Sequence, residues 1–115
     1  MSELREKKKQ ITRQKLIDAA SVEFAEVGYS NALMARISNN AGYGNGTVYN
    51  YFPSKFDLLL AVVNNAMKRL VKEIRKRIIK IDDPLEQLKR GLEVDFKFML
   101  DNEALSKVII REGFA

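Results

Sequence analysis

Apolar residues recur every three or four positions along most of this sequence, the spacing that places them on one face of a helix. Over residues 12–27 this spacing predicts a first helix, and Gly28 follows it where a left-handed helix end is typical. Shorter apolar patterns predict two further helices, over residues 33–40 and 45–51, with Gly42 between them. The first half of the chain is therefore expected to form one long and two short helices.

The second half begins with a longer apolar repeat, which predicts a fourth helix as far as Ile81. Ser54 and Asp57 have the spacing of a capping box at its start. Asp83 and Pro84 are the residue types preferred at the cap and first position of a fifth helix. The apolar face of this fifth helix carries Leu85, Leu88, Leu92, Phe96 and Met99.

The fourth and fifth helices are expected to pack on each other through these apolar faces. Leu88, Leu92 and Phe96 are the expected partners of the preceding repeat. A sixth helix is expected from about residue 105 onward. No alternating strand pattern, internal repeat or low-complexity segment is present, so the fold class is predicted to be all-α.

The composition argues against several kinds of chemistry. The chain of 115 residues has no cysteine and no histidine, which leaves no disulfide, no usual zinc ligand set and no imidazole base. No apolar stretch typical of a signal peptide follows the charged first residues, and no run approaches the roughly 20 apolar residues of a membrane span. We therefore expect a cytoplasmic protein with no metal or cofactor and no membrane partner, and an enzyme is the least favoured class.

The net charge of +5 is unevenly distributed. Residues 1–15 hold six basic side chains against two acids, and residues 68–80 hold seven against one. A basic protein of this kind favours a polyanionic partner such as a nucleic acid. We expect the second basic run to be a solvated helix face, because the apolar residues between its charges can pack inside the protein.

Residues 41–55, AGYGNGTVYNYFPSK, combine three glycines with three tyrosines and contain no acid. Two short helices joined by a glycine-containing turn and packed on a longer helix form a helix-turn-helix candidate. Gly42 lies in the turn, where a positive φ is accessible to glycine, and Val48 and Phe52 are spaced to face the core. An outward surface of neutral hydrogen-bonding groups suits base edges and phosphates. Here that surface consists of Asn45, Thr47, Tyr49 and Asn50.

Lys55 lies in the first turn of the fourth helix, where its charge is unfavourable to the helix dipole. A phosphate bound close to the same N-terminus would compensate for that charge. The basic residues 5–15 would add sequence-independent affinity for such a partner.

The segment of roughly residues 10–63 resembles the DNA-binding domain of the tetracycline-repressor (TetR) family. Four pieces carry the resemblance together: AA..EFAEVGY (19–29), IS..AG (37–42), GTVYNYFPSK (46–55) and LLLAV (58–62). The resemblance implies a three-helix head that binds DNA, then a long connecting helix and a helical regulatory domain that dimerises and binds a small ligand. By this interpretation, residues 1–53 form the DNA-binding domain with its basic arm. Residues 54–115 form the connecting helix and an incomplete regulatory domain.

The resemblance also implies roles for individual residues. It assigns the recognition helix to about residues 44–51, with Asn45 and Asn50 at base edges and Thr47 at a base or the backbone. The family's phosphate-contacting positions correspond to Tyr49, Tyr51 and Lys55, and Arg36 could supply further charge. The glycines expected to shape the turn and the approach to DNA are Gly42, Gly44 and Gly46. Simple packing remains an alternative for the two tyrosines, and a solvated surface for the two asparagines.

The sequence departs from the family pattern at two helix caps. Ala32 and Leu33 stand where two hydroxyl residues are common, so Ser30 or Asn31 could cap the second helix instead. Gly44 stands where a serine is usual, which predicts a weaker cap for the recognition helix. A looser, more adaptable head is expected.

The function implied is that of a sequence-specific transcriptional regulator. The simplest form is a ligand-responsive repressor that binds a pseudo-palindromic operator of double-stranded DNA as a homodimer. Family members usually carry several more helices, including the pair that forms the dimer interface. A second class of function also stays open, a truncated protein-interaction module that pairs with full-length family members and modulates them, although the missing dimer helices argue against tight pairing.

Overall fold

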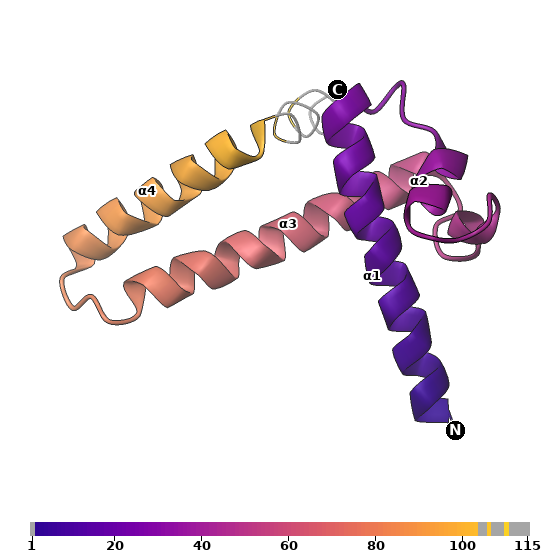
Figure 1. The fold of residues 1–115 in the computed structure, drawn as a ribbon. Coiled ribbons are helices and arrows are strands. Elements are labelled where there is room, and N and C mark those ends of the chain that lie inside the picture. The colour runs from indigo at the N-terminus through magenta and orange to yellow at the C-terminus, as the bar shows by residue number, and fades with distance from the viewer. Residues whose placement is uncertain (1, 104–105, 107–109, 111–115) are drawn as a thin grey trace. The chain divides into compact units, whose positions relative to one another are not determined.

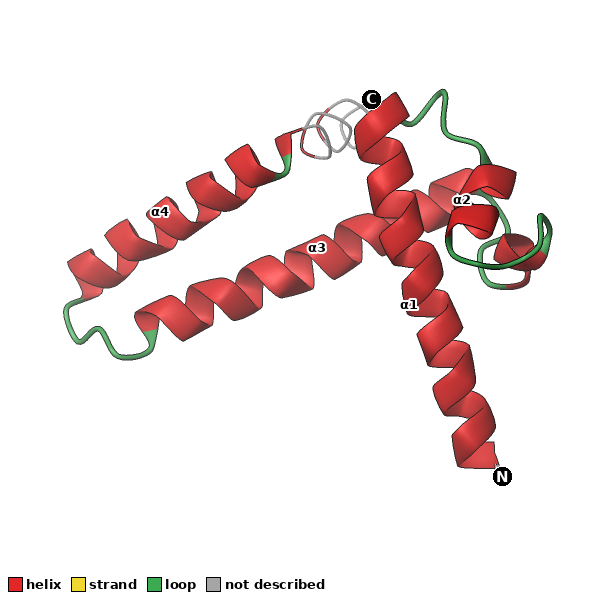
Figure 2. Ribbon diagram, in the orientation of Figure 1, coloured by secondary structure: helices red, strands yellow, loops and turns green. Residues whose placement is uncertain are grey.

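The computed structural model describes residues 2–103, 106 and 110, and this part of the chain is helical and contains no strand (Figures 1 and 2). The all-α prediction is confirmed. The elements are α1 (Ser2–Val27), α2 (Met34–Asn40), the 3-10 helix η1 (Thr47–Asn50), α3 (Lys55–Ile78) and α4 (Pro84–Asp101). The sixth helix expected around Leu105, Val108 and Ile109 lies outside the described residues. By its internal contacts the chain forms two compact units, Met1–Val62 and Val63–Ala115, and each is described by itself.

The first unit is built around apolar residues from every one of its helices. Its buried side chains include Leu16, Ile17, Ala20 and Phe24 of α1, Ile37 of α2, Val48 of η1, Phe52, and Leu58, Leu59 and Val62 of α3. The long and two short helices predicted for this half are thus held together by one core. Because Leu58 to Val62 belong to that core, the first two turns of α3 pack with the head.

Two glycines end helices in this unit as expected. Gly28 has a φ of 80° and donates its N–H to the carbonyl of Phe24, 3.0 Å away, which closes α1. Gly42 has a φ of 93° and donates to the carbonyl of Asn39 at 3.0 Å in the turn after α2. Positive φ is unstrained for glycine, so both turns depend on the absence of a side chain.

Helix α1 begins ten residues earlier than its apolar stripe. Residues 2–11 are all exposed, and their Glu, Leu, Arg, Lys and Gln residues favour helix by intrinsic propensity rather than by packing. The hydroxyl of Thr12 donates to the carbonyl of Lys8 at 3.0 Å within the same helix. The basic arm is therefore a helical extension of α1.

The third element is shorter than predicted. The sequence predicts a recognition helix over residues 44–51, but the structure has a 3-10 helix of four residues, Thr47–Asn50. Its cap position is Gly46, which offers no side chain to the first N–H groups. Two glycines, at 44 and 46, and a missing cap raise the free energy of regular helix at this point, so the segment before Thr47 is turn.

The start of α3 carries the expected serine cap. The Ser54 hydroxyl accepts from the N–H of Asp57 at 3.1 Å, as in a capping box. Instead of reaching back to the backbone, the Asp57 carboxylate accepts a hydrogen bond of 2.8 Å from that same hydroxyl.

In the second unit, the later turns of α3 and all of α4 run antiparallel beside each other (Figure 1). The cap of α4 is confirmed, since the Asp83 carboxylate accepts from the N–H of Leu85 at 3.3 Å and Pro84 begins the helix. The cationic side chains of residues 68–80 are all exposed, as expected of a solvated face.

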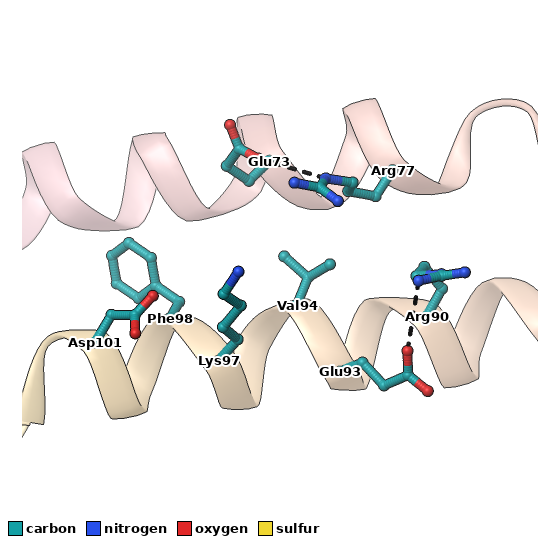
Figure 3. Close-up of a pocket in the computed structure, with 8 residues that line it drawn as sticks. All are labelled: Glu73, Arg77, Arg90, Glu93, Val94, Lys97, Phe98 and Asp101. Atoms are coloured by element: carbon teal, nitrogen blue, oxygen red, sulfur yellow. Dashed lines mark ion pairs between the residues drawn. The ribbon is translucent and has the colours of Figure 1, made fainter.

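The face that α4 turns toward α3 differs from the prediction. Leu88, Leu92 and Phe96, the expected partners, are 60%, 60% and 64% exposed. Val94 and Phe98 instead point toward α3 and are half-buried (Figure 3). Gly91 lies on the same side, where an added Cβ would be 3.8 Å from the Cγ2 of Ile74 on α3. The face that carries Gly91, Val94 and Phe98 thus lies toward α3, and the larger apolar face is left exposed.

Candidate nucleic-acid interface

The residues around η1 divide into buried and outward sets as the sequence predicts. Val48 is fully buried and Phe52 is 3% exposed, so both anchor the element in the core. Asn45, Tyr49 and Asn50 are exposed. Thr47 and Tyr51 are half-buried. The polar surface assigned to DNA is thus accessible, apart from the buried portions of these last two residues.

An open groove of about 500 Å³ brings the basic arm to this surface. One wall is a single face of α1, with Lys9 and Arg13 among its residues, and the other wall is η1 and the residue after it. The lining residues are Glu6, Lys9, Gln10, Arg13, Thr47, Asn50 and Tyr51. The structure therefore places three of the proposed contact residues beside two cations of the arm, whereas Asn45 and Tyr49 do not line this groove.

Two side-chain contacts hold α1 to the turn and to the residues after η1. The Tyr43 hydroxyl donates to the Thr12 hydroxyl at 3.2 Å. The Arg13 guanidinium carbon lies 5.2 Å from the centre of the Phe52 ring, a cation–π distance. Tyr43 stands in the turn of the motif, so this residue ties the turn to the first helix.

Lys55 has an internal set of partners. Its ammonium donates to the carbonyl oxygens of Ser30 at 3.3 Å and Ala32 at 3.1 Å. It also lies 4.9 Å from the centre of the Tyr29 ring. The half-buried lysine therefore links the start of α3 to the loop between α1 and α2. Contact with a phosphate stays a prediction, to which the structure adds this bracing role.

Arg36 is paired with a buried acid. Its guanidinium lies 3.4 Å from the carboxylate of Glu23, which is 2% exposed, while the arginine side chain itself is 47% exposed. The same carboxylate oxygen of Glu23 accepts from the N–H of Leu33 at 3.0 Å. The part of Arg36 that faces solvent remains available to a phosphate.

Glu23 supplies the hydrogen bond that the missing hydroxyl residues leave open at the start of α2. The cap position of α2 is Leu33, which makes no side-chain cap. The expectation that Ser30 or Asn31 would cap α2 is therefore wrong; the Asn31 amide instead donates to the carbonyl of Val27 at 3.2 Å. In a capping box an acid three residues into the helix reaches back to the cap N–H. Here the acid comes from α1.

Sequence reasoning also missed Ser38, a fully buried polar residue on α2. Its hydroxyl donates to the carbonyl of Gly44 and accepts from the N–H of Val48 at 3.3 Å. The available signal was its place next to Ile37 within the apolar pattern of a short helix. A serine in that position needs partners, and the turn and η1 provide them.

The second unit holds a separate cavity of about 420 Å³ between α3 and α4 (Figure 3). Its ion pairs stay within single helices, Glu73 with Arg77 at 3.8 Å and Arg90 with Glu93 at 3.7 Å. Val94, Lys97, Phe98 and Asp101 complete the lining. In the described part of the chain, no group of three acidic residues is placed to hold a metal ion, and no helix is long and apolar enough to span a membrane.

The first unit is therefore a helix-turn-helix head, with a first helix that buries one stripe in the core, a short second helix, a glycine turn and an exposed polar element beside a basic arm. Residues 16–62 match the family model described as "Bacterial regulatory proteins, tetR family". The helix-turn-helix head thus belongs to the tetR family of bacterial regulatory proteins.

Proteins similar to this chain are named as transcriptional regulators, in agreement with this assignment. The chain is 33% identical over 87 residues to the HTH-type transcriptional activator FasR of Mycolicibacterium smegmatis, covering 76% of this chain and 40% of FasR. It is 31% identical to the HTH-type transcriptional regulator BetI of Yersinia pestis, covering 84% of this chain and 50% of BetI. The structure resembles that of the fatty acid degradation regulator FadR from Bacillus halodurans, with a TM-score of 0.75 and 32% identity over 87% of this chain and 52% of FadR. The chain thus spans about half the length of these relatives.

Proposed function

We propose that this protein is a sequence-specific DNA-binding transcriptional regulator, acting as a ligand-responsive repressor on a pseudo-palindromic operator. The observation that carries the proposal is the groove in which Lys9 and Arg13 of the basic arm lie beside Thr47 and Asn50 of η1. Cations that bind phosphates next to amide and hydroxyl groups that bind base edges are the two components of a specific protein–DNA interface.

In this proposal Asn45, Thr47 and Asn50 contact bases in the major groove. The outward amides suit adenine, and the threonine hydroxyl suits several bases. Tyr49, Tyr51, Lys55 and Arg36 contact phosphates, together with the cations of the arm. Their exposure supports these roles for Tyr49 and Arg36, whereas Lys55 would have to reach a phosphate from its position against the loop.

The regulatory part of the proposal concerns the second unit. In a protein of the relatives' length, a homodimer would place two heads on the two halves of the operator. A small-molecule effector would bind within the helical domain to which α3 leads, and the charged cavity between α3 and α4 supports a ligand there. Binding of the effector would then lower the affinity for DNA, and binding of DNA would lower the affinity for the effector by the same factor.

Selection of bound duplexes from a random pool tests the proposal. The wild type is expected to enrich one sequence pattern, and Asn50→Ala is expected to relax the preference at one or two positions of it. Asn64→Ala is the matched control, because this asparagine is exposed and belongs to the second unit. Enrichment of no pattern by the wild type would refute the proposed function.

A second function is supported by one observation on α4. Five of its exposed apolar residues form a set symmetric about Leu92, with Leu88 and Phe96 four positions to either side and Leu85 and Met99 seven, while Leu100 lies outside this set. If two such helices met antiparallel with their Leu92 residues opposed, Leu88 of one copy would face Phe96 of the other, and Leu85 would face Met99. Lys89 would then face Asp95 of the second copy, three positions from the centre on opposite sides. This favours the alternative that the chain pairs with another copy of the family and modulates it.

Analytical ultracentrifugation of the 115-residue chain tests this second function. A dimer that Leu92→Lys dissociates is expected if the α4 face pairs. Sedimentation of the wild type as a monomer at every concentration would remove the support for this alternative.

A further inference from the structure

Ser38 holds both ends of the turn between the two short helices. Its backbone carbonyl accepts from the N–H of Tyr43 at 3.0 Å. Its hydroxyl donates to the carbonyl of Gly44 and accepts from the N–H of Val48 at 3.3 Å. The side chain is fully buried, so water does not compete for these bonds. A single residue of α2 therefore fixes the start of the turn, its last part and the middle of η1.

The hydroxyl adds to other contacts of its partners, since the Gly44 carbonyl also accepts from the N–H of Thr47 at 3.2 Å and the Val48 side chain lies in the core. Val48 is fully buried, and its N–H needs a partner because an unpaired buried donor is costly. Gly44 and Gly46 flank the turn and have a wide range of accessible backbone angles. The cap position of η1, Gly46, makes no side-chain hydrogen bond.

We infer that Ser38 is a positioning residue for base readout. It sets the direction in which η1 presents Thr47 and Asn50 to DNA without itself contacting DNA. This inference rests on the proposed function and extends it. Without the hydroxyl, the two glycines allow the start of η1 to shift, although Val48 and Phe52 still hold the element in the core. Such a shift displaces the groups that contact base edges, while the cations of the arm, which lie on α1, keep their places.

The geometry predicts a particular change in binding. Contacts to base edges require defined directions, whereas attraction to the phosphate backbone does not. Loss of the Ser38 hydroxyl should therefore reduce the preference for the selected duplex more than the affinity for any duplex. This distinguishes a positioning role from a general loss of folding, which lowers both affinities alike.

The test compares Ser38→Ala with Ser54→Ala in the full chain. Ser54 is the matched control because its hydroxyl also accepts from a backbone N–H, that of Asp57, but caps α3 and does not contact η1. Both variants are measured below their unfolding temperatures, against the duplex selected by the wild type and a scrambled competitor. Ser38→Ala is expected to lower the ratio of the two affinities about tenfold, the discrimination that one well-placed side chain provides at a base edge. Its affinity for the competitor should change less than about twofold, and Ser54→Ala should leave the ratio unchanged.

An unchanged ratio in Ser38→Ala, or an equal loss in Ser54→Ala, would overturn the inference. If the wild type shows no preference between the duplexes, the proposed function itself has failed, and the inference fails with it. Should Ser38→Ala not fold, Ser38→Cys serves instead, because a thiol of similar shape is a weak acceptor. A wild-type ratio in that variant, or unprotected exchange of the Val48 amide hydrogen in the wild type, would also overturn the inference.

Discussion

The carboxylate of Glu23 accepts a 3.0 Å hydrogen bond from the backbone N–H of Leu33, a residue ten positions further along the chain. The acid lies on α1 and the N–H begins α2, so this one bond fixes how the second helix leaves the first. Arg36, one turn into α2, neutralises the same carboxylate at 3.4 Å. The buried carboxylate is satisfied because it has a cation and a backbone donor as partners. Removal of its charge would leave the Arg36 guanidinium and the Leu33 N–H without a charged acceptor.

Replacement of this acid should therefore destabilise the head. Glu23→Gln keeps the shape but removes the charge, and charge-assisted bonds are about twice as strong as neutral ones. We expect a loss of about 1–2 kcal/mol in the free energy of unfolding, measured by urea denaturation. Glu26→Gln is the control on the same helix, because Glu26 is exposed. A difference between the two variants below about 0.5 kcal/mol, the usual range for surface changes, would contradict the role of Glu23.

Lys55 is expected to act on both stability and DNA affinity. Lys55→Met removes the donor to the carbonyls of Ser30 and Ala32, which should lower stability by about 1 kcal/mol. If the ammonium also reaches a phosphate, the variant's affinity should fall for all duplexes alike. The salt slope, which is the slope of log affinity against log salt concentration, should then decrease in magnitude by about 1. Lys68→Met, an exposed lysine further along α3, is the control for both measurements. Loss of stability with an unchanged salt slope would restrict Lys55 to its bracing role.

The helical arm should supply sequence-independent affinity. The triple change of Lys7, Lys8 and Lys9 to glutamine should reduce the slope of log affinity against log salt by roughly 0.9 for each phosphate that the arm no longer neutralises. The same removal of three charges at Lys72, Arg75 and Lys76, which are exposed on α3, is the matched control. Equal slopes for the two triple variants would show that net charge alone, and not the position of the arm, governs binding.

Two glycines should respond to alanine with opposite signs. Gly91 lies within α4, and an added Cβ would be in ordinary contact with Ile74 at 3.8 Å. Gly91→Ala should therefore stabilise the chain by about 0.5–1 kcal/mol, since alanine favours helix. Gly28→Ala should destabilise it by about 1 kcal/mol, because the φ of 80° is strained for alanine. Thermal unfolding of both variants measures these changes in stability. A destabilising Gly91→Ala would contradict the ordinary contact of 3.8 Å between the added Cβ and the Cγ2 of Ile74.

Local signals in the sequence were sufficient for much of the fold. Gly28 ends α1 and Asp83 caps α4 because these effects involve residues within four positions of each other. The burial of Val48 and Phe52 follows from their spacing and the core around them. The outward position of Asn50 follows from the same spacing.

Contacts between distant residues were beyond the reach of the sequence pattern. A buried acid and a buried serine look unfavourable in an apolar stripe until the donors that reach them from other segments are known, as for Glu23 and Ser38. On α4 the pattern identified an apolar face but not which face packs on α3. The face toward α3 carries Gly91, Val94 and Phe98, and a count of apolar residues does not identify it.

The arm has a further consequence because it is helical. Arg5 and Lys9, and Lys9 and Arg13, are four positions apart and so lie above one another on the same side of α1, where like charges repel and Glu6, 3.8 Å from the Lys9 ammonium, offsets part of the repulsion. A polyanion laid along that side would relieve the repulsion and increase the helix content of the arm. Ionic strength then acts on this segment in two opposing ways: it shields the cations from one another and steadies the helix, while it weakens the attraction that draws the arm to its partner.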